Sequence, residues 1–109
     1  IPKRIQTEDK ELFAFAGLWD KWENDGKKIF TCTLLTKDAD EYMQQYHHRM
    51  PIILPREKED MWITNSFPTP KDAQEFIINV DTEPLTAYTV SDYVNNARNN
   101  DATCIEPIV

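Results

Sequence analysis

The segment Leu12–Trp22 reads LFAFAGLWDKW and is the clearest strand signal in the chain. Its aromatic residues favour a β-strand, and both alternating sets of side chains are apolar until Asp20. A strand with two apolar faces is typical of the interior of a sheet. We therefore expect a central strand rather than an edge strand.

A turn signal follows this strand at Asn24-Asp25-Gly26. Asp-Gly tolerates the positive φ that a tight reversal needs, so Lys27–Thr36 should return as a second strand. The sequence thus predicts a β-hairpin over residues 11–36. Cys32 lies in the returning strand, where a buried small thiol is expected. Cys104 belongs to no metal-spaced cluster, and we expect both cysteines to be reduced.

Short helices and strands are predicted for the rest of the chain. Asp38 and Glu41 have the spacing of a capping box, so a helix should begin near Asp38 and stop around residues 48–50, before Pro51. The prolines confine residues 51–55 to an edge or bulged strand. The remaining predicted elements are helices at 56–62 and 71–78, the second capped by Thr69, a strand at 84–90, a short helix or turn at 92–99 and a final strand at 104–109.

The order of these elements indicates an α+β fold on a largely antiparallel sheet, or a partly closed barrel, with short peripheral helices. A length of 109 residues fits one domain, residues 1–109. No apolar run reaches the roughly 20 residues of a membrane-spanning helix, and residues 1–5 lack a signal-peptide core. We expect a soluble protein with no membrane partner.

The net charge of −7 argues against an autonomous nucleic-acid binder with a broad basic surface. The acidity is concentrated in residues 72–109, where seven acids and one base give a net charge of −6. Residues 1–71 carry twelve acids and eleven bases, a net charge of −1. Any anion-binding surface should therefore lie before Asp72.

Both histidines lie together, at His47 and His48, before Arg49-Met50-Pro51. Adjacent residues of a helix point about 100° apart, so one ring could face a cleft and the other water. A proton-transfer role near neutral pH is within reach. The alternative is that His47 binds the carbonyls of a helix end and His48 is solvated. No His-x₃-His spacing or Cys/His cluster exists, so no metal site is predicted.

Two further groups leave alternatives open. Asp20 and Glu23 could form a carboxylate pair; alternatively, Asp20 forms a salt bridge or caps the turn, and Glu23 is exposed to solvent. The tryptophans are more often core residues than platforms for base stacking; they are Trp19, Trp22 and Trp62.

Three segments taken together resemble one family. They are Phe13-Ala-Phe-Ala-Gly-Leu-Trp-Asp-Lys-Trp22, then Thr31-Cys-Thr-Leu-Leu-Thr36 followed by His47-His-Arg-Met-Pro-Ile-Ile-Leu54, and finally Val90-Ser-Asp-Tyr-Val-Asn95. In this order and spacing they are similar to the SOS response-associated peptidase (SRAP) family, which includes the abasic-site processing proteins.

The resemblance implies a β-rich fold whose positively charged cleft holds single-stranded DNA. In that family an N-terminal cysteine, assisted by an upstream asparagine, a glutamate and a histidine, reacts with the aldehyde of an abasic site and closes a thiazolidine. Thiol autopeptidase activity is also attributed to the family. The histidine maps to His47, while Arg49 and Thr36 would contact DNA phosphates. No cofactor is implied.

The chain matches only the C-terminal half of the family pattern, since the Met-Cys start and the upstream asparagine and glutamate motifs do not occur in it. We expect the C-terminal portion of a SRAP-like domain, whose missing N-terminal half supplies the nucleophile, so that this chain alone does not crosslink DNA. The implied setting is the DNA damage response, in the bacterial cytoplasm at the nucleoid or in the eukaryotic nucleus. Two alternatives remain: a catalytically silent module that binds single-stranded DNA or a partner, and a hydrolase that cleaves its own propeptide.

Overall fold

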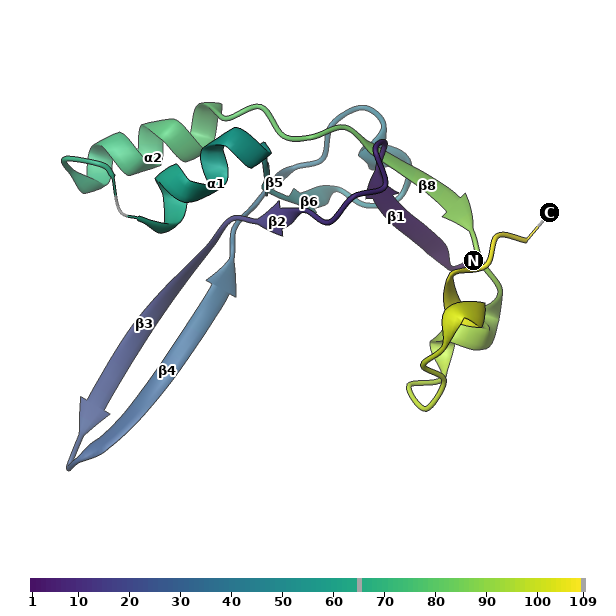
Figure 1. The fold of residues 1–109 in the computed structure, drawn as a ribbon, viewed down its shortest axis with the longest axis horizontal. Helices are drawn as coiled ribbons and strands as arrows, with labels where there is room; N and C mark the ends of the chain where they lie inside the picture. The colour runs from purple at the N-terminus through teal and green to yellow at the C-terminus, as the bar shows by residue number, and fades with distance from the viewer. Residues whose placement is uncertain (65, 109) are drawn as a thin grey trace. The chain divides into compact units, whose positions relative to one another are not determined.

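Four two-stranded antiparallel sheets and two α-helices make up the described part of this computed structural model, residues 1–64 and 66–108. The strands are β1 (Lys3–Thr7), β2 (Ala14–Phe15), β3 (Gly17–Asn24), β4 (Lys27–Leu34), β5 (Thr36–Asp38), β6 (Arg49–Pro51), β7 (Ile53–Leu54) and β8 (Leu85–Thr89). The helices are α1 (Arg56–Ile63) and α2 (Pro70–Asn79) (Figure 1). The α+β prediction is confirmed, and in this part of the chain the strands form short ladders rather than a closed barrel.

The chain divides into two units, Leu12–Glu83 and the pair of segments Ile1–Glu11 and Pro84–Val109. The larger unit contains β2 to β7 and both α-helices, and it holds all three residues that the sequence singles out as a site. None of the helices in the described ranges is long and apolar enough to cross a bilayer.

The predicted hairpin is confirmed as β3 and β4, which pair from Gly17↔Leu34 to Asn24↔Lys27. Its turn places Asp25 at φ 50° and Gly26 at φ 79°. Positive φ at both central residues is the condition for the two-residue turn whose twist matches that of the strands. The Asp-Gly signal therefore acts as the sequence predicts.

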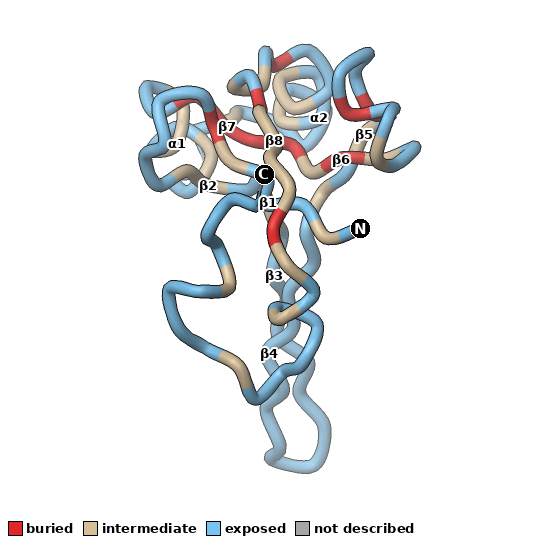
Figure 2. The backbone as a smooth tube through the Cα atoms, turned by 90° about the vertical axis from the view of Figure 1, so that its right-hand side faces the viewer, coloured by how far each residue is buried: buried red, intermediate tan, exposed pale blue. Residues whose placement is uncertain are grey.

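The prediction of a central strand is wrong for β3. Within the described residues β3 pairs with β4 alone, and Figure 2 shows the hairpin exposed along nearly all of its length. Trp19 is 71% exposed and Trp22 is 51% exposed, so neither is the core residue that the sequence suggested. Cys32 is likewise exposed rather than buried. Both faces of the hairpin carry apolar side chains, as the sequence predicts, but the described elements leave most of both faces exposed.

The centre of the larger unit is a backbone junction of three residues. Ala16 donates its N–H to the carbonyl of Ile52 over 2.8 Å, Ile52 donates to Leu35 over 3.0 Å, and Leu35 donates to Ala16 over 3.0 Å. Ala16 is fully buried, and it joins a core cluster with Ile52, Leu54 and Val80. The junction lies where β2 passes into β3, β4 into β5 and β6 into β7, so it fixes the start of each short ladder.

The helix predicted to run from near Asp38 to around residues 48–50 is wrong. Asp38 ends strand β5, and only a 3₁₀ turn forms, at Met43–Gln45. The side chain that accepts at its start belongs to Asp40, whose Oδ1 receives the N–H of Met43 over 2.8 Å. Pairing of β5 with β6 keeps Asp38 extended, and this tertiary contact outweighs the local helix signal.

Both α-helices were predicted correctly. Thr69 caps α2 by accepting the N–H of Asp72 on its side chain over 3.2 Å, and Pro70 occupies the first helical position. The ring of Trp62 on α1 stacks on that of Phe76 on α2, with centroids 6.2 Å apart. This aromatic contact holds the two helices together.

The smaller unit is built on the β1–β8 ladder, which runs from Lys3↔Thr89 to Thr7↔Leu85. Strand β8 and the 3₁₀ turn Asp92–Asn95 match the predictions, whereas β1 was missed because its sequence, KRIQT, lacks an apolar alternation. The final strand predicted at 104–109 is wrong, since Ala102–Ile105 forms a 3₁₀ turn and a single bridge follows at Pro107. Its last residue lies outside the described residues.

Candidate functional site

The β5–β6 ladder brings two of the three predicted site residues onto one face. Its register pairs Thr36 with Pro51, Lys37 with Met50 and Asp38 with Arg49. Since directly opposed residues share a face and alternate along the strand, Thr36, Asp38 and Arg49 project together. Met50 projects to the other face and is 1% exposed. The buried methionine therefore anchors the strand that presents Arg49 at the surface.

The guanidinium of Arg49 is held by two neighbours. Its Nη1 donates to Oδ1 of Asp38 over 2.6 Å, and its Nη2 donates to the hydroxyl of Thr36 over 3.0 Å. These contacts use two of the five N–H donors of the group, which leaves donors for a planar or tetrahedral anion. The predicted helix N-terminus beside Thr36 is absent from the described residues, because Thr36 begins strand β5. Only its hydroxyl and strand backbone are available.

His47 folds back on the strand that follows it. The N–H of Arg49 donates to Nδ1 of His47 over 3.0 Å, and the carbonyl of Arg49 lies 3.2 Å from the same nitrogen. Both contacts involve Nδ1, so this nitrogen faces the backbone of Arg49 in either tautomer, and Nε2 is the other ring nitrogen available to a ligand. His47 thus binds backbone downstream of it, not the carbonyls of a helix end.

The two histidine rings lie against each other instead of pointing about 100° apart. Their centroids are 4.4 Å apart at an interplanar angle of 23°, and both residues are exposed. The expected divergence assumed a helix, and this segment is the irregular end of a turn. His47 and His48 therefore share one surface.

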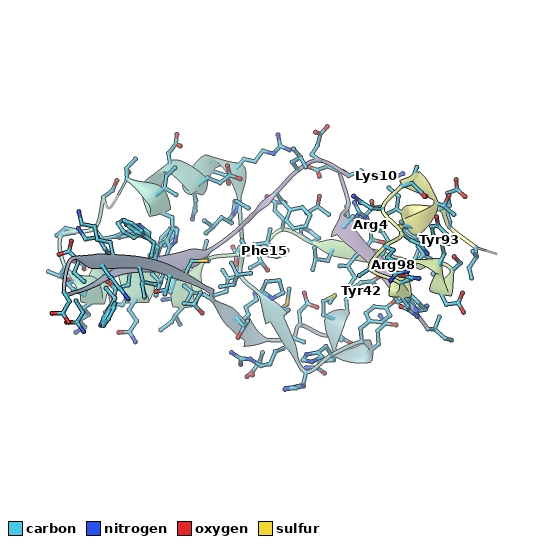
Figure 3. The ribbon with its side chains drawn as sticks, turned by 90° about the horizontal axis from the view of Figure 1, so that it is seen from below. Arg4, Lys10, Phe15, Tyr42, Tyr93 and Arg98 are labelled. Atoms are coloured by element: carbon cyan, nitrogen blue, oxygen red, sulfur yellow. The ribbon has the colours of Figure 1, made fainter. Side chains whose placement is uncertain are left out.

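Tyr42 and Tyr46 flank the 3₁₀ turn that precedes the histidines. Tyr42 is labelled in Figure 3. Their ring centroids are 5.8 Å apart in an edge-on arrangement. A side-chain hydrogen bond with Tyr42 raises the pKa of Tyr46 above its usual range. This hydrogen bond favours the neutral form of the Tyr46 phenol.

The alternative carboxylate pair does not form. Asp20 and Glu23 are three residues apart on β3, so they face opposite sides of the hairpin. Asp20 accepts the N–H of Lys21 over 2.8 Å, and Glu23 forms ion pairs with Lys21 and Lys28. Across residues 1–64 and 66–108, no group of three or more His, Cys, Asp or Glu side chains could hold a metal ion.

A separate apolar pocket of about 540 Å³ lies beside the base of the hairpin. Its lining residues are Gly17, Leu18, Trp19, Trp62, Ile63, Phe67 and Ala73. The indole N–H of Trp62 donates to the carbonyl of Gly17 over 2.9 Å, which fixes one wall. Neither His47 nor Arg49 lines this pocket, so the predicted site lies outside it.

Asp38 is the neighbour that sequence reasoning missed. It was assigned to a helix cap, and its contact with Arg49 becomes visible only once residues 36–38 are a strand paired with 49–51. The signal that could have found it is the Thr-Lys-Asp alternation facing Arg-Met-Pro, with a buried Met50 between two outward residues.

The sequence of this chain is similar to those of several abasic site processing proteins. The chain is 37% identical to the abasic site processing protein YoaM of Bacillus subtilis, over 97% of this chain and 47% of that protein. It is 39% identical to YoqW of the same bacterium, over 97% and 48%, and 34% identical to the abasic site processing protein HMCES of Pongo abelii, over 89% and 28%. The chain thus spans about half the length of the bacterial relatives.

A solved structure supports the fold. An X-ray crystal structure of a protein from Bacteroides thetaiotaomicron superposes with a TM-score of 0.78 at 27% identity, over 100% of this chain and 49% of that one. The sequence model of one family, described as SOS response associated peptidase (SRAP), matches residues 1–97. Because that match takes in the hairpin, the His47–Arg49 segment and strand β8, this chain belongs to the SRAP family.

Proposed function

We propose that this chain is the C-terminal portion of a single SRAP-like domain that processes abasic sites in single-stranded DNA. The support is the family match and the names of the relatives, which are abasic site processing proteins. The action takes place where such DNA is exposed during the damage response, at the bacterial nucleoid or in the nucleus of a eukaryote.

The observation that carries this proposal is the arrangement around Arg49. A guanidinium that Thr36 and Asp38 hold at an exposed edge retains N–H donors for a DNA phosphate. The same residue binds Nδ1 of His47 through its backbone, so the phosphate contact and the imidazole are fixed relative to each other. DNA held by Arg49 and the hydroxyl of Thr36 therefore passes close to a group that can exchange a proton at Nε2.

The covalent chemistry requires an α-amine and a thiol on one N-terminal cysteine, which we place in the part of the relatives that this chain does not span. An N-terminal cysteine would condense its α-amine with the ring-opened aldehyde of the abasic sugar, which releases one water and forms a C=N bond. Its thiol then adds to that carbon, and the sulfur proton passes to nitrogen as the thiazolidine closes. Each step moves protons on the sugar oxygen or the amine, and we assign that transfer to His47.

The exposed hairpin supports the view that more polypeptide completes the domain. Trp19 and Phe30 lie on one face of β3–β4 with ring centroids 6.1 Å apart and are 71% and 65% exposed, and Trp22 on the other face is 51% exposed. Two apolar faces of this size are normally covered in a folded domain. The half of the relatives that this chain does not span is the candidate cover and the source of the cysteine, asparagine and glutamate.

A gel experiment on the complete protein tests the proposal. The protein is incubated with a single-stranded oligonucleotide that bears one abasic site, and the products are separated under denaturing conditions. A band retarded by the mass of the protein is expected with the abasic oligonucleotide and not with an undamaged one. Binding without a retarded band would instead identify a silent DNA-binding module and refute the covalent step.

Mass spectrometry of the mature N-terminus tests whether the complete protein cleaves its own propeptide. Removal of the initiator methionine alone, with cysteine exposed, agrees with crosslinking chemistry that needs no further cleavage. Loss of a longer propeptide before that cysteine, abolished when the cysteine is replaced by alanine, would establish thiol autopeptidase activity.

A further inference from the structure

The ion pair between Arg49 and Asp38 is short but highly exposed. Nη1 of Arg49 and Oδ1 of Asp38 are 2.6 Å apart. The side chain of Asp38 is 93% exposed and that of Arg49 is 41% exposed. Exposed pairs of this kind contribute little to folding stability, because water solvates both charges almost as well when they are apart. The carboxylate can therefore leave the guanidinium at little cost when another anion arrives.

The backbone, rather than this ion pair, holds the two strands in place. Residues 36–38 and 49–51 pair through their ladder, and Met50 is buried on its opposite face. The neighbouring cation Lys37 projects away from the site and donates to the hydroxyl of Thr82 over 3.0 Å. Asp38 is thus not needed to form the strand pair, and its charge acts mainly on Arg49.

We propose that Asp38 is an internal counter-ion that competes with DNA phosphate for Arg49, and so sets the affinity and salt dependence of DNA binding. The inference rests on the phosphate contact in the proposed function and extends it to a residue with no assigned role. An oxygen of the Asp38 carboxylate occupies one guanidinium donor, as a phosphate oxygen would. A phosphate that approaches this edge of the guanidinium takes the donor from the carboxylate or shares it, and a phosphate that uses the remaining donors still meets the negative charge of Asp38.

The competition has a consequence for binding to any single-stranded DNA. With Asp38 ionised, the charge at the Arg49 position sums to zero, so phosphates are attracted only over short distances. The protein then avoids persistent attachment to undamaged strands, which outnumber lesions. Binding at low salt should rise when the carboxylate charge is removed.

The test compares Asp38→Asn with the parent in the complete protein, using an undamaged oligonucleotide and fluorescence anisotropy across a salt series. Asparagine keeps the size and an acceptor oxygen for Arg49 but removes the charge. We expect binding about three- to tenfold tighter near 50 mM salt, a difference that fades towards 0.5 M, and a log–log salt slope steeper by about 0.7. Asp38→Ser, which also removes the charge, should behave in the same direction.

Two controls isolate the pair. Glu75→Gln, on exposed α2, changes the net charge equally and should leave affinity within about twofold of the parent. In an Arg49→Ala background, Asp38→Asn should give no gain. The proposal is overturned if Asp38→Asn binds no tighter, if Glu75→Gln gains as much, or if the gain survives without Arg49.

These outcomes separate this inference from the function on which it rests. If Arg49→Ala weakens binding while Asp38→Asn changes nothing, the phosphate contact stands and the counter-ion proposal falls. If Arg49→Ala leaves binding unchanged at low salt, the placement of DNA at this edge is wrong and both proposals fall together.

Discussion

The backbone N–H of Arg49 donates to Nδ1 of His47 over 3.0 Å. Arg49 therefore presents its guanidinium at the surface and also orients the imidazole of His47 through its backbone. With Nδ1 engaged, Nε2 is the nitrogen that can exchange a proton with a ligand. A shift of strand β6 would move both groups together. The histidine and the arginine of the His-x-Arg-Met-Pro segment therefore act as one geometric unit.

His47→Ala should slow formation or reversal of the abasic-site adduct by about 10²-fold in the complete protein, because it removes the group proposed to move protons. His48→Ala is the matched control, since its ring is stacked on that of His47 and is also exposed. Rates are read from denaturing gels over time. If adduct formation or reversal is slow in His48→Ala and has the parent rate in His47→Ala, the proton-transfer role was assigned to the wrong ring.

Arg49→Ala should weaken binding to single-stranded DNA and lower the log–log salt slope by about 0.7, the contribution of one phosphate contact on a single strand. Anisotropy titrations at several salt concentrations measure both quantities. Lys71→Ala, an exposed cation at the start of α2, should leave the slope nearly unchanged. Equal effects from the two variants would indicate a diffuse attraction instead of a defined contact.

Local sequence signals predicted much of the secondary structure correctly. Asp25-Gly26 fixed the hairpin turn, and Thr69-Pro70 fixed the start of α2, because each depends on backbone angles and hydrogen bonds within a few residues. Where a distant strand decides the conformation, local reasoning failed. Asp38 satisfied a helix-capping pattern, but pairing with Arg49 eleven residues later holds it in β5.

The candidate site was only partly predictable from the sequence, because its contacts also depend on pairing between distant segments of the chain. The resemblance identified His47, Arg49 and Thr36, and the structure brings Arg49 and Thr36 into direct contact. Sequence could not show that His47 binds the backbone of Arg49, since this requires a turn rather than a helix before it. Burial was also misjudged at Trp19, where an apolar pattern predicts the need for a partner but not which polypeptide provides it.

Met50→Ala should destabilise the complete protein by about 2–5 kcal/mol, because it leaves a cavity beneath the strand that presents Arg49. Met50 is 1% exposed and is one of the largest fully buried side chains. Met61→Ala, at a position 41% exposed, should cost less than about 1 kcal/mol. Urea denaturation of both variants gives the comparison, and similar midpoints would contradict the anchoring role of Met50.

Gly26→Ala should cost about 1 kcal/mol, because an L-residue at φ 79° is strained even though no described atom beyond its chain neighbours lies within 4 Å of the added methyl group. Asp25→Asn, at φ 50°, should change the free energy of unfolding by only a few tenths of a kcal/mol, since asparagine tolerates positive φ. Thermal unfolding measures both. A neutral Gly26→Ala would show that the turn can relax to another type.

Tyr93→Phe should raise the pKa of Asp101 towards its usual value. The Tyr93 hydroxyl donates to Oδ2 of Asp101 over 2.7 Å, and this bond is the main cause that lowers the pKa of the carboxyl group. A lowered pKa in the folded state means that the carboxylate favours folding at neutral pH, and that this contribution disappears as pH falls through the folded pKa. NMR titration of the carboxyl carbon follows the change. Tyr88→Phe, whose hydroxyl donates to the carbonyl of Ile105 instead, should leave that titration unmoved, and an equal shift in both variants would assign the lowered pKa to another cause.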